Sequence, residues 1–181
     1  KAMANGFSVA AVCGKKKYME LGSIEKKNKE RVFLLSTTHG AEMSSLGAFV
    51  ETISFLRKNN VINKNWNYGY RLIQSVNEIT KELNICEYFK FFGPACSPYY
   101  ICRGVDYKIS FEFRTLFIQE MLKNNILMPW VSIAYRHNDK TFEQTRIALE
   151  KSLTTYKKAL VHGIKKYLKS DAIKPVFRRF N

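Results

Sequence analysis

The sequence predicts an α/β segment followed by an α+β domain that holds a small antiparallel sheet. Short apolar runs beside glycine-containing turns come first, in residues 1–40, and indicate strands joined by loops. Two stretches with helical spacing of apolar residues follow in residues 41–83. Residues 87–113 then hold three short apolar runs between turn residues, a pattern typical of an antiparallel meander. Because the pattern changes after the first helix, we expect one unit over residues 1–60 and a second over residues 61–181.

The first unit is expected to combine short strands with helices. An apolar run between Gly6 and Gly14 predicts a buried strand. A helix with apolar residues at helical spacing from Met43 to Leu56 ends the unit. The expected elements are, in order, a strand at 7–13, a helical turn at 15–20, a strand at 31–35 and a helix at 41–58.

The second unit is expected to place helices before and after the meander. Turns at Gly93-Pro94 and at Gly104 separate the strands. Asn138 or Asp139 precedes a long amphipathic stretch and is the predicted N-cap of the last helix. The expected elements are, in order, a helix at 64–83, strands at 88–92, 99–102 and 107–113, a helix at 115–124, an extended segment at 126–134 and a helix at 141–169.

The chain is strongly basic, but its charge is spread out. Lys and Arg number 30 against 15 Asp and Glu, which gives a formal net charge of +15. The lysines occur in twos and threes along the chain, among many asparagines, and this indicates a solvated surface. A basic nucleic-acid-binding module is the alternative, and the tail Phe177-Arg178-Arg179-Phe180 would then contact RNA or DNA. A docked aromatic tail with solvated arginines is the other interpretation of that segment.

The sequence lacks the features of a membrane-spanning protein and the cysteine spacing of a metal site. No apolar stretch reaches the roughly 18 residues that a membrane-spanning helix needs, and no signal-like apolar core follows the first residues, so we expect a soluble, cytoplasmic protein. The four cysteines, Cys13, Cys86, Cys96 and Cys102, are irregularly spaced and have no companion His in ligand register. We therefore expect reduced packing residues and no metal site, with a disulfide or a zinc site as the alternative.

Two local patterns near the start of the chain could carry chemistry. Lys1 precedes a run of small residues, and a lysine amine with a lowered pKa attacks aldehydes, although a single Lys is most often a surface residue. The hydroxyl-rich turn at 36–40 lies between a predicted strand and a predicted helix, where hydroxyls and free amides bind phosphate. An ordinary helix cap is the alternative for this turn.

A third pattern, Tyr-Arg-His-Asn-Asp, occupies residues 135–139. In one interpretation, Arg136 or His137 points into a cleft. In the other, Asn138 or Asp139 only caps the last helix and Arg136 pairs with a surface carboxylate. The sequence favours neither.

Together these patterns resemble the C-terminal half of a class III aminotransferase, the fold type I group of pyridoxal-phosphate enzymes that includes glutamate-1-semialdehyde aminomutase. The most specific match is residues 1–15, which are similar to the family's lysine, glycine-rich turn and short strand. Residues 36–42 resemble its Thr-x-x-Gly turn, and residues 133–139 resemble a histidine-containing stretch of its small domain. The matches occur in the family's order, and the resemblance covers residues 1–169.

The resemblance implies both a fold and a function. Residues 1–60 would be the end of the large domain that binds the cofactor, and residues 61–181 the small domain. Lys1 would form a Schiff base with pyridoxal 5'-phosphate (PLP) and move protons at the substrate Cα, with a pyridoxamine-phosphate intermediate. Thr37, with Thr38 beside it, would bind the cofactor phosphate across a subunit interface. The implied protein is a homodimeric aminotransferase or aminomutase that acts on a small-molecule amino donor and acceptor.

The chain also departs from the aminomutase pattern. Residues 5–7 and 40–42 replace a Gly-rich turn and an Asn-Pro pair, which favours a sibling branch that acts on a sugar or amino-acid precursor. In the family, the pyridinium partner, the ring-stacking residue and the phosphate cup precede the lysine. We therefore expect this chain to be the second half of a longer enzyme and to be inactive without the first. A catalytically inactive structural paralogue is the remaining alternative.

Overall fold

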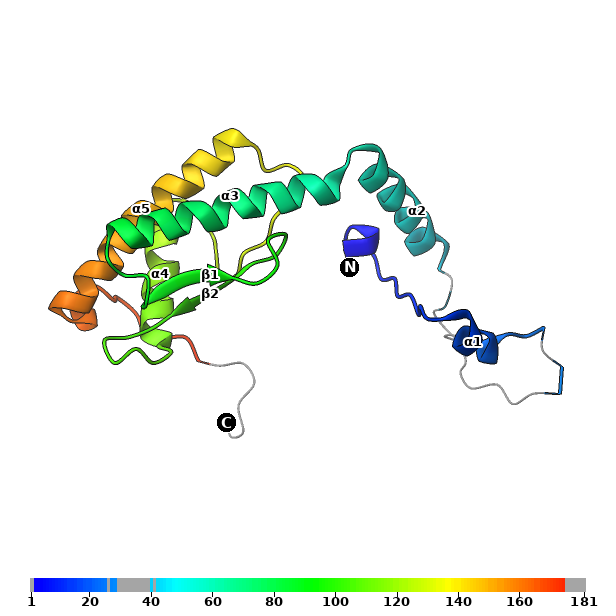
Figure 1. The fold of residues 1–181 in the computed structure, drawn as a ribbon, viewed down its shortest axis with the longest axis horizontal. Coiled ribbons are helices and arrows are strands. Elements are labelled where there is room, and N and C mark those ends of the chain that lie inside the picture. The colour runs from blue at the N-terminus through cyan, green and yellow to red at the C-terminus, as the bar shows by residue number, and fades with distance from the viewer. Residues whose placement is uncertain (1, 26, 29–39, 41, 175–181) are drawn as a thin grey trace. The chain divides into compact units, whose positions relative to one another are not determined.

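The computed structural model describes residues 2–25, 27–28, 40 and 42–174, and the chain divides into two compact units, Lys1–Val61 and Ile62–Asn181 (Figure 1). In the first unit, the described residues form helices and turns. A 3-10 turn at Ala2–Ala4 packs against α2 (Met43–Lys58), and Ala4 is fully buried. A short α1 (Lys16–Met19) continues into a second 3-10 turn at Glu20–Gly22. Both helices predicted for this unit are confirmed.

The buried strand predicted at 7–13 is wrong. This segment forms no regular secondary structure, and the side chains of Phe7 and Val12 are 51% and 64% exposed. An apolar run becomes a buried strand only when a neighbouring strand pairs with its backbone N–H and C=O groups. The described part of this unit contains no such strand. The strand predicted at 31–35 lies outside the described residues.

The second unit has long helices packed with a β-hairpin. Its elements are, in order, α3 (Val61–Glu82, which begins at the last residue of the first unit), β1 (Phe89–Phe92), β2 (Tyr99–Cys102), α4 (Phe111–Lys123), α5 (Asp139–His162) and a 3-10 turn at Ile164–Lys166. The predicted helices and the first two predicted strands are confirmed.

The hairpin provides the centre of the hydrophobic core. Its strands pair antiparallel, with Phe89 opposite Cys102 and Phe92 opposite Tyr99. Because successive side chains of a strand point to opposite faces, one face of the hairpin is buried and the other is solvated. The core combines this face with all three helices and includes Leu72, Val76, Phe89, Tyr100, Phe117, Leu149, Leu153 and Tyr156.

The third strand predicted at 107–113 is wrong. A single bridge between Arg103 and Ile109 extends the hairpin, and α4 begins directly after Ser110. The Ser110 hydroxyl accepts a hydrogen bond from the backbone N–H of Phe113 at 3.2 Å. This N-cap satisfies one of the free N–H groups in the first turn of the helix, so the helix outcompetes a strand at this position.

The last helix is shorter than the predicted 141–169. It ends at Gly163, whose φ of 88° lies in the left-handed region that favours glycine. Beyond this residue the chain turns back and packs along α4, where Lys169 N–H donates to the side-chain oxygen of Gln119 at 2.9 Å.

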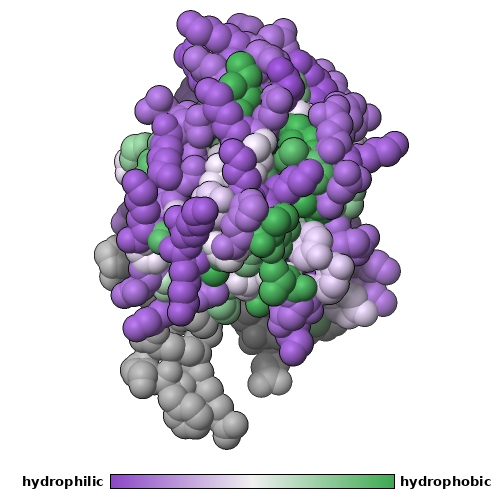
Figure 2. Space-filling view, turned by 90° about the vertical axis from the view of Figure 1, so that its left-hand side faces the viewer, coloured by the Kyte–Doolittle hydropathy of each residue, from purple (hydrophilic) through white to green (hydrophobic). Residues whose placement is uncertain are grey.

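Figure 2 shows one face of the molecule, on which hydrophilic side chains predominate and hydrophobic ones form separate patches.

Candidate functional site

The residues that the sequence predicts to hold the cofactor lie outside the described residues. These are Lys1, Thr37 and Thr38. The structure does describe the turn that follows Lys1, in which Ala2 and Met3 are exposed and Ala4 is buried. The roles of the three residues therefore stay predictions. The stretch at 135–139 is described, and it borders two adjoining hollows in the second unit.

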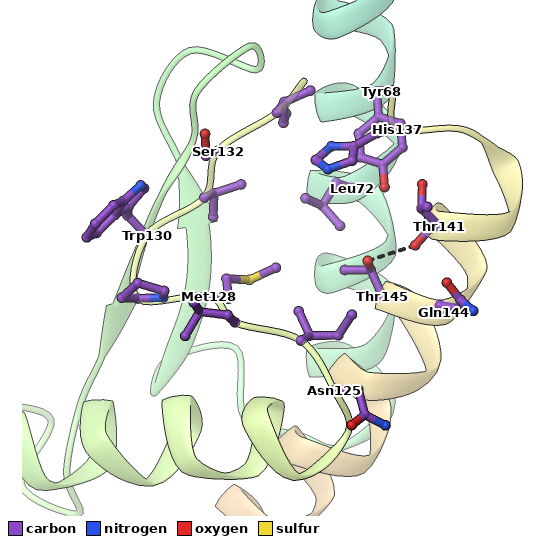
Figure 3. Close-up of a pocket in the computed structure, with 15 residues that line it drawn as sticks. Tyr68, Leu72, Asn125, Met128, Trp130, Ser132, His137, Thr141, Gln144 and Thr145 are labelled. Carbon is purple, nitrogen blue, oxygen red and sulfur yellow. Dashed lines mark hydrogen bonds between the residues drawn. The ribbon is translucent and has the colours of Figure 1, made fainter. Parts of the chain in front are cut away.

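The first hollow is an apolar pocket of about 410 Å³ between α3, the segment 125–134 and the first turns of α5 (Figure 3). Tyr68 and Leu72 from α3 form one wall. Its remaining lining residues are Asn125, Ile126, Leu127, Met128, Pro129, Trp130, Val131, Ser132, Ile133, His137, Thr141, Gln144 and Thr145. An apolar hollow of this size with a few polar groups is typical of a small-molecule site.

Two side chains hold the segment that forms the opposite wall. The Tyr100 hydroxyl lies 2.9 Å from the carbonyl oxygen of Met128 and 2.8 Å from that of Pro129. Arg114 donates to the same Pro129 oxygen at 2.8 Å, and its guanidinium lies 4.5 Å from the centre of the Tyr100 ring. Burial raises the pKa of the Tyr100 hydroxyl well above its ordinary 10.0, despite the opposing charge of Arg114. The phenol therefore stays protonated and remains a donor at neutral pH.

His137 lies at the end of the pocket, where the segment turns into α5. Its backbone N–H donates to the Ala134 carbonyl at 3.0 Å, and its Nδ1 accepts from the Ala134 N–H at 3.2 Å. Because Nδ1 is an acceptor, the neutral ring carries its proton on Nε2. The ring lies 5.3 Å from that of Tyr68, centre to centre. His137 is thus held in one orientation by its own turn and by α3.

The start of α5 is fixed by a capping box. The Asn138 side chain accepts from the backbone N–H of Thr141 at 3.0 Å, and the Thr141 hydroxyl accepts from the Asn138 N–H at 2.8 Å. The predicted N-cap is confirmed at Asn138. Asp139 has a different role, because its carboxylate accepts a hydrogen bond from Arg71 of α3 at 2.7 Å.

The second hollow is a polar cleft of about 560 Å³ beside the pocket. It shares Tyr68 and His137 with the pocket as lining residues. Its other lining residues are Lys64, Asn65, Asn67, Arg71, Ala134, Tyr135, Arg136, Asn138 and Asp139. Both interpretations of the stretch at 135–139 are therefore partly correct: Asn138 caps the helix, while Arg136 and His137 border a cleft.

Sequence reasoning did not identify the α3 side of this cleft. Lys64, Tyr68 and Arg71 stand at positions i, i+4 and i+7, a spacing that places them on one face of a helix. This polar and aromatic face of α3, beside the apolar face of the same helix, is the sequence pattern that could have indicated the cleft. What the sequence could not show is that this face meets residues 134–139.

Neither a metal site nor a membrane span emerges from the described part of the chain. There, no three side chains of His, Cys, Asp or Glu come together in a way that could hold a metal ion. None of the described helices is long and apolar enough to cross a membrane.

Comparison with known proteins relates the chain to transaminases. No protein-family model matches it. It is 28% identical over 163 residues to a 3-aminobutyryl-CoA aminotransferase from Cloacimonas acidaminovorans (strain Evry), a match that covers 88% of this chain and 37% of the relative. Its fold matches part of a transaminase with PLP bound, with a TM-score of 0.72, 15% sequence identity and coverage of 90% of this chain and 38% of that protein. The chain thus spans little more than a third of the length of each.

Proposed function

We propose that this chain is part of a PLP-dependent aminotransferase. The observation that carries the proposal is the agreement of two comparisons: the relative in sequence is an aminotransferase, and the relative in structure is a transaminase with PLP bound. Each match covers about nine-tenths of the chain, so it rests on both units. The resemblance found in the sequence motifs points to the same class.

The residues available for the cofactor fit its chemistry. Lys1 supplies an amine for the cofactor aldehyde, and Thr37 and Thr38 supply hydroxyls for its phosphate. Ala2 and Met3 are exposed, which allows a ring to approach the chain beside Lys1. PLP, when bound, supplies an electron sink for carbanion chemistry. In this proposal Lys1 holds the cofactor covalently and then moves a proton at the substrate Cα.

The surface of the first unit supports a role inside a larger domain. Along α2, the side chains of Met43, Leu46 and Val50 lie on one face of the helix and are 82%, 38% and 61% exposed. A helix of a folded domain normally buries its apolar stripe. We propose that the rest of the large domain, or the second subunit of a homodimer, covers this face.

Finer assignments follow from the same proposal. An aminotransferase fits the comparisons better than an aminomutase does, because the sequence relative is named a 3-aminobutyryl-CoA aminotransferase. A homodimer with the cofactor at the subunit interface is the assembly that we propose, with a small-molecule amino donor and acceptor. The proposed location is the cytoplasm.

Covalent attachment of the cofactor tests the proposal. Borohydride reduction of the complete protein with PLP, followed by peptide mapping, is expected to place a pyridoxyl group on the ε-amine of Lys1. Lys1→Ala is expected to remove both this adduct and the visible absorbance of the lysine-bound cofactor, because no other residue is proposed to supply the amine.

Lys15→Ala is the matched control, because Lys15 is an exposed lysine of the same unit. It is expected to retain the adduct. An unmodified Lys1 in the wild-type protein, or an adduct that persists in the Lys1→Ala variant, would refute the proposed role.

A further inference from the structure

The polar cleft beside the pocket carries an excess of positive charge. Lys64, Arg71 and Arg136 line it, and Asp139 is its only carboxylate among the described lining residues. These four charged side chains sum to a positive charge. Cations gathered in a concave surface raise the local concentration of anions.

The charges of Arg71 and Asp139 largely cancel one another. Their side chains are 2.7 Å apart, and the guanidinium of Arg71 also lies 4.3 Å from the centre of the Phe142 ring. An arginine that is hydrogen-bonded to a carboxylate and stacked on an aromatic ring is fixed in place. This pair therefore shapes the wall of the cleft and leaves the other two cations to attract a ligand.

Lys64 and Arg136 have N–H donors that remain available to a ligand. The Lys64 ammonium lies 3.3 Å from the Tyr135 hydroxyl and 4.6 Å from the centre of that ring, which orients it and leaves further N–H donors. The guanidinium of Arg136 makes no hydrogen bond or ion pair with any described residue. Guanidinium and ammonium groups together are the donors that proteins use for carboxylate and phosphate.

The adjoining apolar pocket requires that part of the ligand is apolar. Tyr68 and His137 belong to both hollows, so a ligand in one lies beside the other (Figure 3). Leu72, Met128 and Val131 make the pocket wall apolar. A molecule that fills both hollows carries a negative group at one end and an aliphatic body at the other.

We propose that the two hollows form one binding site for a small amphipathic anion, an aliphatic chain that ends in a carboxylate or a phosphate. Lys64 and Arg136 bind the anionic group, and the pocket between Leu72 and Met128 takes the aliphatic part. Tyr68 and His137 line both regions, at the place where the two hollows adjoin.

Calorimetric titration of the complete protein with hexanoate tests this site. Acetate keeps the charge and lacks most of the chain, while hexanol keeps the chain and lacks the charge. Both are expected to bind at least about tenfold more weakly than hexanoate, because each loses one half of the site. Hexyl phosphate is compared with hexanoate, and the tighter of the two identifies the anionic group.

Charge-neutralising variants test the residues. Arg136→Gln is expected to weaken hexanoate about tenfold, since it removes a charged hydrogen bond, and Arg136→Lys is expected to restore part of the affinity. Lys140→Gln is the matched control, because Lys140 is an exposed cation close to the cleft that does not line it. It should change the affinity by no more than about twofold, as expected for an exposed charge that makes no direct contact.

Two results would overturn the site: equal affinity for hexanoate and hexanol, or equal weakening by Arg136→Gln and Lys140→Gln. The ligand series needs no variant, so a misfolded variant would not rescue the proposal. Neither titration uses PLP. Failure here is therefore separable from failure of the Lys1 adduct experiment.

Discussion

Gly69 shows how one residue controls the packing of the second unit. It lies within α3, at the point where the helix crosses the turn after β1. A Cβ atom at this position would lie 1.6 Å from the carbonyl oxygen of Ala95 and 2.9 Å from Cδ1 of Ile133. Ile133 also lines the apolar pocket, so the same close approach positions part of the candidate site. Only a residue without a side chain allows it.

Gly69→Ala is expected to destabilise the protein by about 2 kcal/mol, because the backbone at Ala95 has to move and overpacking outweighs the better helix propensity of Ala. The measurement is the midpoint of urea unfolding.

Gly47→Ala is the matched control. Gly47 is exposed in α2, and an added Cβ would meet nothing within 4 Å. This substitution should be neutral or should stabilise α2 by about 0.5–1 kcal/mol. Equal unfolding midpoints for the two variants would contradict the close packing at Gly69.

Among the elements, α4 has a second function besides filling the core. Its Gln119 side chain donates to the Tyr167 carbonyl at 3.1 Å and accepts from the Lys169 N–H at 2.9 Å. The Thr115 hydroxyl accepts from the Ile173 N–H at 2.9 Å. These bonds attach the segment after α5 to α4 through its backbone, as a neighbouring strand would do in a sheet.

Gln119→Ala is expected to release this segment without unfolding the core. Amide hydrogen exchange of residues 164–173 should rise by about thirtyfold, because two hydrogen bonds of about 1 kcal/mol each are lost. Exchange in α3 and α5 should stay unchanged.

Gln74→Ala serves as the control, since Gln74 is an exposed residue of α3. If both variants leave residues 164–173 as protected as in the wild type, the segment is held by its apolar contacts instead.

At the scale of the whole molecule, the buried hydrophobic side chains among the described residues belong to the second unit, except for Ala4 and Val61. The second unit has a continuous core of aromatic and aliphatic side chains. That core also holds ionisable groups, and burial raises the pKa of Cys102, Tyr100 and Tyr156 above their ordinary values. The Tyr156 hydroxyl is satisfied by the Arg103 carbonyl at 2.7 Å.

Because of these groups, we expect the folded protein to lose stability at alkaline pH. In the unfolded chain the thiol loses its proton above pH 9.0 and the phenols lose theirs above pH 10.0, whereas in the folded chain all three stay protonated. The folded state then binds more protons, so the unfolding free energy falls as the pH rises through these values. The expected slope is up to about 1.4 kcal/mol per pH unit for each group, measured by urea unfolding between pH 8 and 11.

Cys102→Ala isolates the first part of this slope. It should lower stability at every pH through the cavity it creates, but it should flatten the dependence between pH 9 and 10. Cys86→Ala, at an exposed cysteine, should leave the dependence as in the wild type. An unchanged slope in Cys102→Ala would show that the thiol is not the group that titrates.

The elements that the sequence predicts correctly depend on neighbours within a few positions. Apolar spacing of 3.6 residues identifies α2, α3 and α5, and the capping box at Asn138 and Thr141 lies within a single helical turn. The turn after Phe92 likewise identifies the hairpin from its own residues. Interactions of this kind join residues that are close in the sequence, so the sequence pattern alone predicts them.

The errors concern interactions between distant residues. Whether residues 7–13 or 107–113 form strands depends on whether another segment pairs with them, and periodicity alone does not reveal a partner. For the candidate site, too, the sequence predicts some parts and not others. Lys1, Thr37 and Thr38 stay predictions from motif resemblance, while the cleft was visible from the sequence only on the Arg136 and His137 side.

The sequence by itself determined the helices, the hairpin and the helix cap. Only the tertiary structure decided that Lys64 and Arg71 of α3 meet Tyr135 and Asp139, some 70 positions further along the chain. The physical reason is that a helix face shows its composition in the sequence, whereas its partner is chosen by the packing of the whole core.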